Sequence, residues 1–464
     1  MTPPFESLLV ANRGEIAVRV IRAAQELGIR TVAVHSDADA TALHVQLADE
    51  AIQIGPHQAS KSYLNVDAIL DAARRSGVQA IHPGYGFLSE SADFSDAVKA
   101  AGMAFVGPSG DAIRAMGDKA TARQTAIHAG VPVVPGSDGL VHDLEAARKE
   151  AARVGYPVMI KATAGGGGRG IRICEDEAAL LKQWTTAQAE AKAAFGNGAA
   201  YLERFVPRAR HIEVQILADG KRAVHLFERE CSLQRRRQKV WEETPSPVLG
   251  DETRRALCTS AVRMAEAVNY SGAGTVEYVY DQASDEFFFI EMNTRIQVEH
   301  PVTEMVTGVD LMRAMIRVAA GEPLGIAQDG IHLRGAAIEV RLNAENPAKD
   351  FFPNVGKIER LVWPGGPGVR VDTLLYPGYQ IPPYYDSLLG KLIVWAEDRP
   401  AAMARMARAL GELRIDGVIT TAALHAVLVR DEQVRRANYH TTFLEPWLAQ
   451  NQALIEQEMK GSHS

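Results

Sequence analysis

The chain has 464 residues, which is too long for one ordinary hydrophobic core and predicts two to four domains. A hydrophobic content of 47% and a charged content of 23% are typical of a globular protein, and the net charge of −7 argues against a general nucleic-acid or anionic-membrane surface. No stretch approaches the roughly 20 consecutive apolar residues of a membrane-spanning helix.

Residues 1–6 carry no basic-then-apolar targeting signal. The three cysteines lack metal-type spacing, so we expect reduced thiols in a cytoplasmic protein.

Strands and helices alternate in the first part of the chain. Strands are predicted at 7–11, 31–35, 51–54, 78–82 and 103–106, and helices from Gly14 and over 66–75 and 94–101. This alternation predicts a parallel sheet of βαβ units. The first strand-to-helix turn, Asn12-Arg13-Gly14-Glu15, lacks the pattern Gly-x-Gly-x-x-Gly, so a dinucleotide site is not expected there.

The segment from His82 to Glu90 is rich in glycine and follows a predicted strand. Open α/β sheets bind ligands at the carboxyl ends of their strands, and glycine permits close approach of the backbone. A purely structural turn explains the segment equally well, so both interpretations stay open.

A glycine-rich loop follows the strand predicted at 156–162, which ends in Lys161. Residues 164–170 read Ala-Gly-Gly-Gly-Gly-Arg-Gly and offer consecutive backbone N–H groups that can bind an anion. Such a loop can also act as a lid. It is not a Walker A loop because the Gly-Lys-Ser/Thr ending is absent, but phosphate binding is favoured over a spacer.

After a predicted helix at 175–194 and a strand at 200–205, Pro207 suggests a domain boundary. The run Gln234-Arg235-Arg236-Arg237-Gln238-Lys239 is a basic cluster, which is most often a solvated face or a nucleic-acid patch. In a net-acidic chain, we favour a site for a polyphosphate or a small anion. A long helix is predicted at 251–268.

The segment from Glu286 to Pro301 carries the most chemistry. Its aromatic and β-branched run at 287–290 predicts a strand. If the backbone stays extended beyond it, one face carries a row of polar side chains, namely Glu291, Asn293, Arg295, Gln297 and Glu299.

The preceding strand at 275–280 should fold back as a hairpin that sets Glu277 opposite Glu291. Facing carboxylates repel unless a cation neutralises them, and Mg²⁺ is commonly held by one or two carboxylates and substrate phosphates. The alternative is a solvated strand face with scattered charges, which the apolar run at 287–290 disfavours.

The remaining chain is predicted to contain a helix at 309–319, a strand at 336–342, β-turns over 351–381, a strand at 391–395 and helices at 401–413 and 420–429. ATP chemistry with Mg²⁺ is indicated by three features together, namely the glycine-rich lid, the pair Lys119 and Lys161, and the two facing carboxylates. Arg295, Gln297 and Glu299 form a site for a small oxyanion, with one strong anion ligand and one candidate base.

Residues 5–448 resemble the biotin carboxylase component of the biotin-dependent carboxylases, within the ATP-grasp superfamily. The resemblance is carried by 11–15, 82–90, 116–119, 164–170, 234–239, 291–301 and 382–387. It implies an α/β fold, α+β in parts, with an N-terminal parallel-sheet domain, an ATP-grasp central domain with a mobile glycine-rich lid, and a C-terminal mixed or antiparallel β domain with helices. The implied boundaries are 1–114 for the N-terminal domain, 115–134 for a helical connector, 135–205 for the lid subdomain, 206–448 for the catalytic and C-terminal part, and 449–464 for a tail that resembles a tag remnant.

The resemblance also implies the role of each matching residue. ATP would be contacted by Lys119, Lys161, Gly165, Gly166, Gly167, Gly168, Glu203, Arg204, Val206, His211, Gln234, Arg237, Glu277 and Glu291. Mg²⁺, or Mn²⁺, would be bound by Glu277, Glu291 and Asn293. Bicarbonate would be held by Lys239, Arg295, Gln297 and Val298, with Glu299 as the base. Arg341 would stabilise the biotin enolate, and Tyr85 would lie near the biotin pocket. Lys239, Arg295, Glu299 and Arg341 would be the catalytic residues.

The implied reaction starts with attack of bicarbonate on the γ-phosphate of ATP to give carboxyphosphate, which breaks down to CO₂ and phosphate. The phosphate then deprotonates biotin N1′, which captures CO₂. One residue departs from the family pattern Gln-Arg-Arg-His-Gln-Lys, because Arg237 occupies the histidine position.

No Ala-Met-Lys-Met biotinylation motif occurs, so the chain is expected to act on biotin carried by another polypeptide, or to be part of a longer one. The partners that the resemblance implies are a biotin carboxyl carrier protein and a carboxyltransferase subunit, and the implied assembly is a homodimer. Two rivals stay open at this point, another ATP-grasp ligase that joins an activated carboxylate to an amine, and a catalytically silent nucleotide-binding subunit. The final acyl acceptor is not encoded in these motifs.

Overall fold

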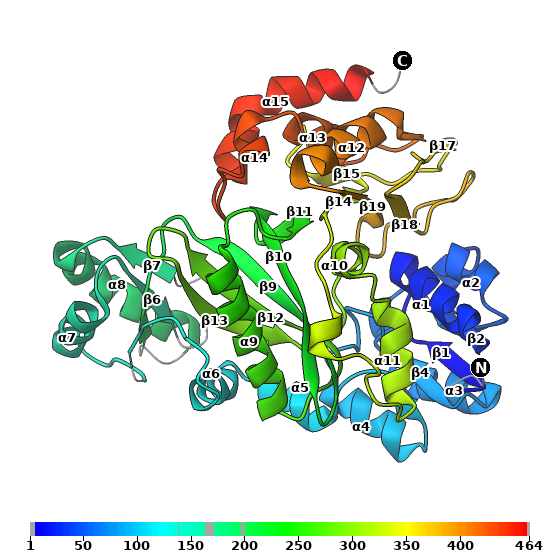
Figure 1. The fold of residues 1–464 in the computed structure, drawn as a ribbon, viewed down its shortest axis with the longest axis horizontal. Coiled ribbons are helices and arrows are strands. Elements are labelled where there is room, and N and C mark those ends of the chain that lie inside the picture. The colour runs from blue at the N-terminus through cyan, green and yellow to red at the C-terminus, as the bar shows by residue number, and fades with distance from the viewer. Residues whose placement is uncertain (1–4, 138, 163–170, 196–199, 462–464) are drawn as a thin grey trace. The chain divides into compact units, whose positions relative to one another are not determined.

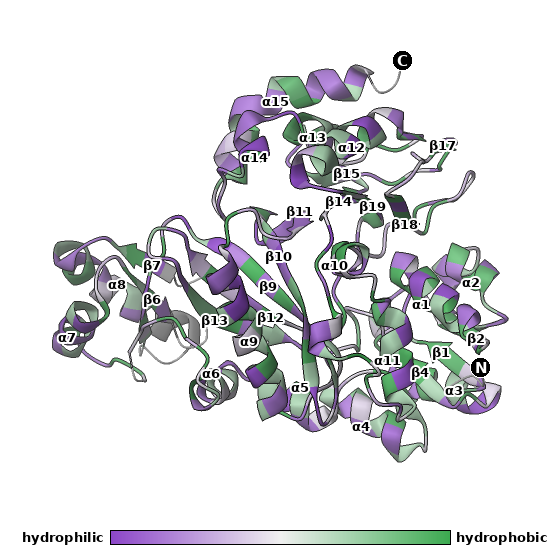
Figure 2. Ribbon diagram, in the orientation of Figure 1, coloured by the Kyte–Doolittle hydropathy of each residue, from purple (hydrophilic) through white to green (hydrophobic). Residues whose placement is uncertain are grey.

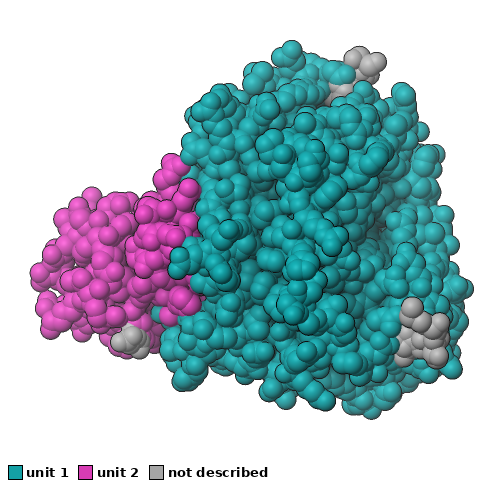
Figure 3. Space-filling view, in the orientation of Figure 1, with its two compact units in different colours: residues 1–131, 210–278, 291–464 teal, residues 132–209, 279–290 magenta. Residues whose placement is uncertain are grey.

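The computed structural model describes residues 5–137, 139–162, 171–195 and 200–461. The predicted phosphate-binding loop at 164–170 lies outside the described residues. The chain divides into two compact units, coloured separately in Figure 3. Unit 1 comprises Met1–Val131, Arg210–Tyr278 and Glu291–Ser464, and unit 2 comprises Pro132–Ala209 and Val279–Ile290. The domain boundaries given above stay predictions.

Unit 1 begins with the predicted parallel sheet (Figure 1). Its strand order is β3-β2-β1-β4-β5, with β1 at Ser7–Val10, β2 at Arg30–Ser36, β3 at Glu50–Gly55, β4 at Ala80–His82 and β5 at Ala104–Phe105. The helices between them are α1 (Gly14–Glu26), α2 (Leu43–Leu47), α3 (Val66–Ser76) and α4 (Ala92–Ala100). The βαβ prediction is therefore confirmed.

Alternation along β1 explains why this sheet is covered on both faces. Leu8 and Val10 pack in one hydrophobic cluster with residues of α1, whereas Leu9 packs in another with residues of α3 and α4. Successive side chains of a strand point to opposite faces, so a fully apolar strand needs helices on both sides. Figure 2 shows both hydrophobic and hydrophilic residues on α1, as expected of a helix with one buried face.

The largest sheet has eight strands in the order β13-β12-β9-β10-β11-β14-β19-β18. The strands are β9 (Arg210–Asp219), β10 (Ala223–Arg235), β11 (Gln238–Thr244), β12 (Ser271–Asp281), β13 (Glu286–Asn293), β14 (Ala336–Asn343), β18 (Val369–Thr373) and β19 (Leu388–Ala396). The antiparallel register pairs Arg229 with Glu213, Gln234 with Lys239, and Glu242 with Glu339. Charged residues therefore face one another across the centre of this sheet.

Several helices of unit 1 pack against strands of this sheet, among them the four that follow. They are α9 (Asp251–Ala267) against β9 and β10, α10 (His300–Thr307) against β10, β11, β14 and β19, α11 (Leu311–Ala319) against β9, and α12 (Arg399–Glu412) against β14 and β19. The helical connector predicted at 115–134 contains the end of α5 (Gly110–Gly117) and all of α6 (Lys119–His128). The two helices are separate because Asp118 caps α6 by accepting from the amide of Thr121.

Unit 2 contains a small antiparallel sheet in the order β7-β6-β8, with β6 at Val158–Ala162, β7 at Ile171–Cys174 and β8 at Ala200–Arg204. Helices α7 (Leu144–Val154) and α8 (Glu177–Phe195) pack against this sheet. Its core includes Val158, Leu180, Trp184 and Leu202.

The C-terminal part of unit 1 contains two small sheets. The segment predicted as β-turns at 351–381 includes the short strands β16 (Phe352–Pro353) and β17 (Arg360–Val362), which pair with β15 (Glu345–Asn346) and β20 (Arg414–Asp416). Helices α13 (Ala422–Leu428), α14 (Glu432–Arg435) and α15 (Leu444–Gly461) follow. Among the described residues, no helix has both the length and the apolar character needed to span a membrane.

Candidate active site

The hairpin of β12 and β13 carries the predicted metal-binding carboxylates. Glu277 on β12 is buried, and Glu291 near the end of β13 is half-buried. Burial, followed by the negative charge of Glu277, raises the pKa of Glu291 above its ordinary value. This electrostatic strain is what a bound divalent cation would relieve, and the oxygen donors of Glu277, Glu291 and Asn293 fit the chemistry of Mg²⁺.

Residues after Asn293 do not continue the strand, so the predicted alternating face ends there. Residues 294–299 form a turn that leads into α10, and Glu299 is the residue that immediately precedes this helix. The polar side chains still converge, because Gln297 Nε2 donates to Glu277 Oε1 at 3.0 Å. A turn, rather than an extended face, brings Gln297 and Glu299 to the carboxylates.

Lys239 lies among three buried carboxylates. Its Nζ is 3.1 Å from Glu277 Oε1 and 2.6 Å from Glu299 Oε1, and it also donates to Glu213 Oε2. Burial would lower the pKa of Lys239, but Glu213, Glu277 and Glu299 outweigh it and raise the pKa well above its ordinary value. The lysine is therefore a permanent cation at the centre of the site.

Arg341 on β14 bonds the other side of the predicted base. Its Nη2 donates to Glu299 Oε2 at 2.9 Å, and its Nε donates to Glu242 Oε1 at 2.6 Å. Burial alone would raise the pKa of Glu299, but Lys239, then Arg341 and Arg229, hold it well below its ordinary value. The base is therefore ionised at neutral pH. Burial raises the pKa of Glu242 to about 7 despite Arg341.

The predicted bicarbonate ligand Arg295 contacts the glycine-rich segment at 82–90. Its Nε donates to Glu90 Oε2 at 2.8 Å, and its Nη2 donates to Asn293 Oδ1 at 3.1 Å. The interpretation of this segment as a merely structural turn therefore loses weight, because it supplies a counter-charge to a predicted ligand.

Tyr85, from the same segment, donates its hydroxyl to the buried Glu15, whose carboxylate is also 3.1 Å from Lys391 Nζ. Lys391 in turn donates to the carbonyl of Val298 at 2.7 Å. Tyr85 is thus connected through Glu15 and Lys391 to the backbone of a predicted bicarbonate ligand.

The remaining predicted ATP ligands of unit 1 lie on separate elements. His211 Nε2 on β9 is 3.1 Å from Glu277 Oε2, and Gln234 Nε2 donates to the carbonyl of Cys231 at 2.8 Å. Lys119 is exposed at the start of α6. Arg237 is exposed and, with Arg236, occupies the left-handed region at the tip of the β10–β11 hairpin, with φ values of 67° and 48°.

Unit 2 carries the other predicted ATP ligands among the described residues. Lys161 on β6 forms an ion pair with Glu203 on β8. The residue directly opposite Lys161 is Tyr201, so Glu203 is its diagonal neighbour, two positions along β8. Arg204 Nη1 is 3.2 Å from Glu286 Oε2, and Val206 is buried.

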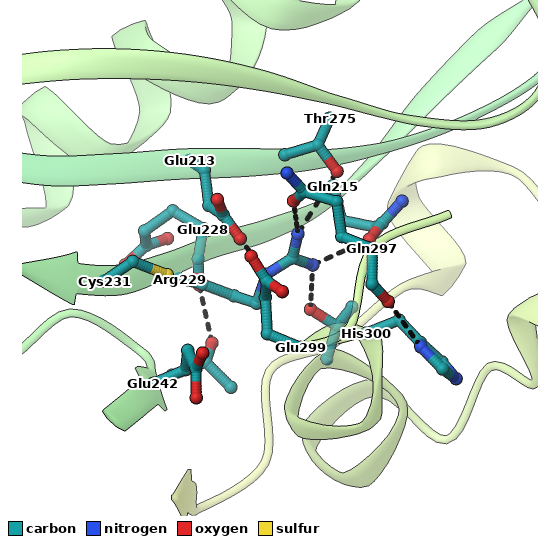
Figure 4. A network of polar contacts seen from close by, with 12 residues as sticks. Glu213, Gln215, Glu228, Arg229, Cys231, Glu242, Thr275, Gln297, Glu299 and His300 are labelled. Carbon is teal, nitrogen blue, oxygen red and sulfur yellow. Dashed lines mark hydrogen bonds and ion pairs between the residues drawn. The ribbon is translucent and has the colours of Figure 1, made fainter. Parts of the chain in front are cut away.

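Several residues of the site were not predicted as functional. Glu213, Arg229 and Glu242 are buried charged residues that bond the predicted ligands Lys239, Gln297 and Arg341, respectively. Figure 4 labels these three buried residues together with Gln297. Glu213 lies two positions after His211 on β9, so the alternation of a strand places both on one face, and this spacing is a signal that the sequence offers. Arg229 lies in Glu228-Arg229-Glu230, a charged run that normally indicates a solvated face, so the sequence alone carries no signal for its burial.

The chain is similar to known proteins over nearly its whole length. Family models match residues 4–113 (Biotin carboxylase, N-terminal domain), 118–327 (Carbamoyl-phosphate synthase L chain, ATP binding domain) and 339–446 (Biotin carboxylase C-terminal domain). The chain is 54% identical over 442 residues to a biotin carboxylase of Nostoc sp., covering 95% of this chain and 99% of the relative. It is 50% identical to a pyruvate carboxylase subunit of Methanothermobacter thermautotrophicus, covering 96% and 90%.

A solved structure is similarly close. The biotin carboxylase domain dimer of Hydrogenobacter thermophilus 2-oxoglutarate carboxylase, in complex with MgADP, ADP and bicarbonate, has a TM-score of 0.86 and 48% identity, and the match covers 97% of this chain and 98% of that one. The chain belongs to the biotin carboxylase family of ATP-grasp enzymes. The predicted family, fold class and enzymatic class, an ATP-dependent biotin carboxylase, are therefore confirmed.

Proposed function

We propose that this chain carboxylates carrier-bound biotin with bicarbonate, at the expense of MgATP and through carboxyphosphate. The observation that carries the proposal is the ionised Glu299, which is bonded on one oxygen by Lys239 and on the other by Arg341. A buried base beside two cations matches a reaction in which a small anion must be bound and deprotonated.

Bicarbonate is proposed to be bound by Lys239, Arg295, Gln297 and the Val298 amide. The cations hold the anion, and Glu299 accepts its proton, which makes the oxygen that attacks the γ-phosphate more nucleophilic. Because the pKa of Glu299 lies well below its ordinary value, the carboxylate is ionised before substrate binds and has free lone pairs to accept a proton. A divalent cation would be held by Glu277, Glu291 and Asn293. When bound, it would neutralise negative charge on the phosphates of ATP.

Nucleotide contacts are proposed for the remaining predicted residues. They are Lys119, Lys161, Glu203, Arg204, Val206, His211, Gln234 and Arg237, together with the glycines at 165–168. Phosphoryl transfer requires mainly positioning and charge neutralisation, which lysines, arginines and backbone amides supply.

Biotin is proposed to bind near Arg341 and Tyr85. The Arg341 guanidinium bears a permanent positive charge and can stabilise the enolate that forms when biotin N1′ loses its proton. Phosphate from carboxyphosphate takes this proton, and N1′ then attacks CO₂.

The proposed partners are a biotin carboxyl carrier protein and a carboxyltransferase subunit, and the proposed assembly is a homodimer in the cytoplasm. The relative from Methanothermobacter is named as part of a pyruvate carboxylase, whereas the Nostoc relative is named simply a biotin carboxylase. The chain has similar sequence identity to both relatives, so the identity does not distinguish between acyl acceptors. We propose that the carboxyltransferase partner determines the acceptor.

The proposed function is tested by measuring ADP release in bicarbonate buffer with and without free biotin. We expect ADP release to require bicarbonate and to rise when biotin is added. An ATP-grasp ligase that uses an amine acceptor would not respond to biotin, and a silent nucleotide-binding subunit would release no ADP, so either result would refute the proposal.

Arg237→His is expected to make the KM for ATP depend on pH. Histidine has an ordinary pKa near 6.5 and loses its charge above that pH, whereas Arg237 stays charged. We expect the KM for ATP to rise about fivefold above pH 7.5 and to approach the wild-type value near pH 6, as suits loss of one exposed charge contact. Initial rates of ATP cleavage at several pH values measure this.

Arg236→His is the matched control. Arg236 lies beside Arg237 in the same turn, but its Nη2 is 2.9 Å from Asp350 Oδ2. Because this contact already occupies Arg236, the Arg236→His substitution should leave the KM for ATP unchanged at every pH. If Arg237→His also left it unchanged, the proposed contact of Arg237 with the nucleotide would be wrong.

A further inference from the structure

The guanidinium of Arg229, on β10, is fully buried and uses all five of its N–H donors (Figure 4). Nε donates to Glu213 Oε1 at 2.6 Å. Nη1 donates to Gln215 Oε1 at 2.7 Å and to Thr303 Oγ1 at 3.0 Å, and Nη2 donates to Thr275 Oγ1 at 3.2 Å and to Gln297 Oε1 at 3.0 Å. The acceptors come from β9, β12, α10 and the turn that precedes α10. One side chain thus joins four segments that carry the candidate active site.

Arg229 determines which way the amide of Gln297 faces. A guanidinium can only donate hydrogen bonds, so Gln297 must present its carbonyl oxygen to Arg229. Its NH₂ group then points the other way and donates to Glu277 Oε1 at 3.0 Å. Arg229 therefore orients the donor group that a bound anion and the predicted metal ligand both require.

Arg229 also holds Glu213, one of the carboxylates that pair with Lys239. Glu213 receives Arg229 on one carboxylate oxygen and Lys239 on the other. Glu213 is fully buried, and these two bonds fix both of its oxygens. Without Arg229, one oxygen loses its partner, and the orientation of the carboxylate against the Lys239 ammonium is no longer fixed.

We propose that Arg229 is a positioning residue for bicarbonate, which acts by orienting Gln297 and by holding Glu213 against Lys239. This inference deepens the proposed function and rests on it. Arg229 does not itself touch substrate, because its five donors are all taken by protein groups.

A merely structural role for this arginine makes a different prediction. If Arg229 only stabilised the sheet, its loss would lower the melting temperature and leave the kinetic constants of the folded fraction unchanged. A positioning role changes the KM for bicarbonate more than the KM for ATP, because Gln297 and Lys239 are the predicted bicarbonate ligands.

Arg229→Lys is the first test. Lysine keeps the charge but cannot reproduce a planar fork with five donors. We expect the KM for bicarbonate to rise about tenfold or more, as for loss of other groups that orient ligands, and the KM for ATP to change by less than about threefold. Steady-state ADP release, with each substrate varied in turn, provides both values.

Thr303→Val is the second test, in case Arg229→Lys does not fold. It removes one acceptor of Arg229 while the shape of the side chain stays nearly the same. The expected increase in the KM for bicarbonate is about fivefold, which corresponds to loss of one typical hydrogen bond.

Arg399→Lys is the matched control. Arg399 forms a two-pronged ion pair with the buried Glu243, with N–O distances of 2.5 and 3.0 Å. Within the described part of the chain, the other partners of their side chains are the carbonyls of Val434 and Arg435 and the hydroxyl of Tyr439, none of them a predicted ligand. Arg399→Lys should lower the melting temperature without separating the two KM values.

A crystal structure of the Thr303→Val or Arg229→Lys variant gives a readout that is independent of turnover. We expect the Gln297 amide to turn away from Glu277, or Lys239 to move away from Glu213. Unchanged side chains together with unchanged KM ratios would overturn the inference. By contrast, wild-type enzyme that releases no ADP in response to bicarbonate would refute the proposed function, whatever these side chains do.

Discussion

Glu299→Gln should abolish most bicarbonate-dependent ATP cleavage. The amide keeps the size of the side chain but cannot accept a proton, and general-base catalysis typically contributes 10²–10⁴-fold to a rate. We therefore expect kcat to fall by at least about 100-fold. The amide also removes one of the three negative charges around Lys239, which should leave that cation freer to hold bicarbonate.

ATP binding should survive this change, because Glu299 contacts Lys239 and Arg341 rather than the predicted nucleotide ligands. Equilibrium binding of ATP, measured beside ADP release, separates the two effects. Glu228→Gln is a suitable control, since Glu228 is a buried carboxylate of the same sheet whose Oε1 is bonded by Arg254 at 2.9 Å and by the amide of Ser246, neither of them a predicted ligand. Turnover close to wild type in Glu299→Gln would reject the role of Glu299 as base.

Arg341→Ala should damage biotin carboxylation more than ATP cleavage. Arg341 is the cation proposed to stabilise the biotin enolate, and loss of one such group typically costs about 10²–10³-fold. We expect carboxybiotin formation to fall by about 100-fold or more. The structure adds a smaller second effect, because the same guanidinium donates to Glu299 and helps to keep it ionised.

ATP cleavage in the absence of biotin should therefore fall by only about tenfold, since Lys239 and Arg229 still lower the pKa of Glu299. Parallel assays of carboxybiotin and ADP, with and without biotin, measure both losses in one preparation. An equal loss in the two assays would contradict this division of roles.

The register of the large sheet explains why part of the site could be predicted. Glu277 and Glu291 lie on consecutive strands joined by a short turn, so a local hairpin was sufficient to predict that their charges influence each other. The continuation of the strand beyond Asn293 was not predictable in the same way. Residues 294–299 leave the sheet to enter α10, and the bonds that hold this turn come from distant segments, including Glu90 and Lys391.

The sequence by itself determined the family, the parallel N-terminal sheet and the chemistry of the reactive side chains, because these depend on residue types at short spacing. Only the tertiary structure decided that Glu213 and Glu299 share Lys239, that Arg341 bonds Glu299, and that Arg229 lies at the centre of the network. Burial and long-range pairing cause this difference. From the sequence, a charged residue such as Arg229 is expected to be exposed to solvent. It can be buried here only because strands and helices that are far apart in the chain supply its hydrogen-bond acceptors.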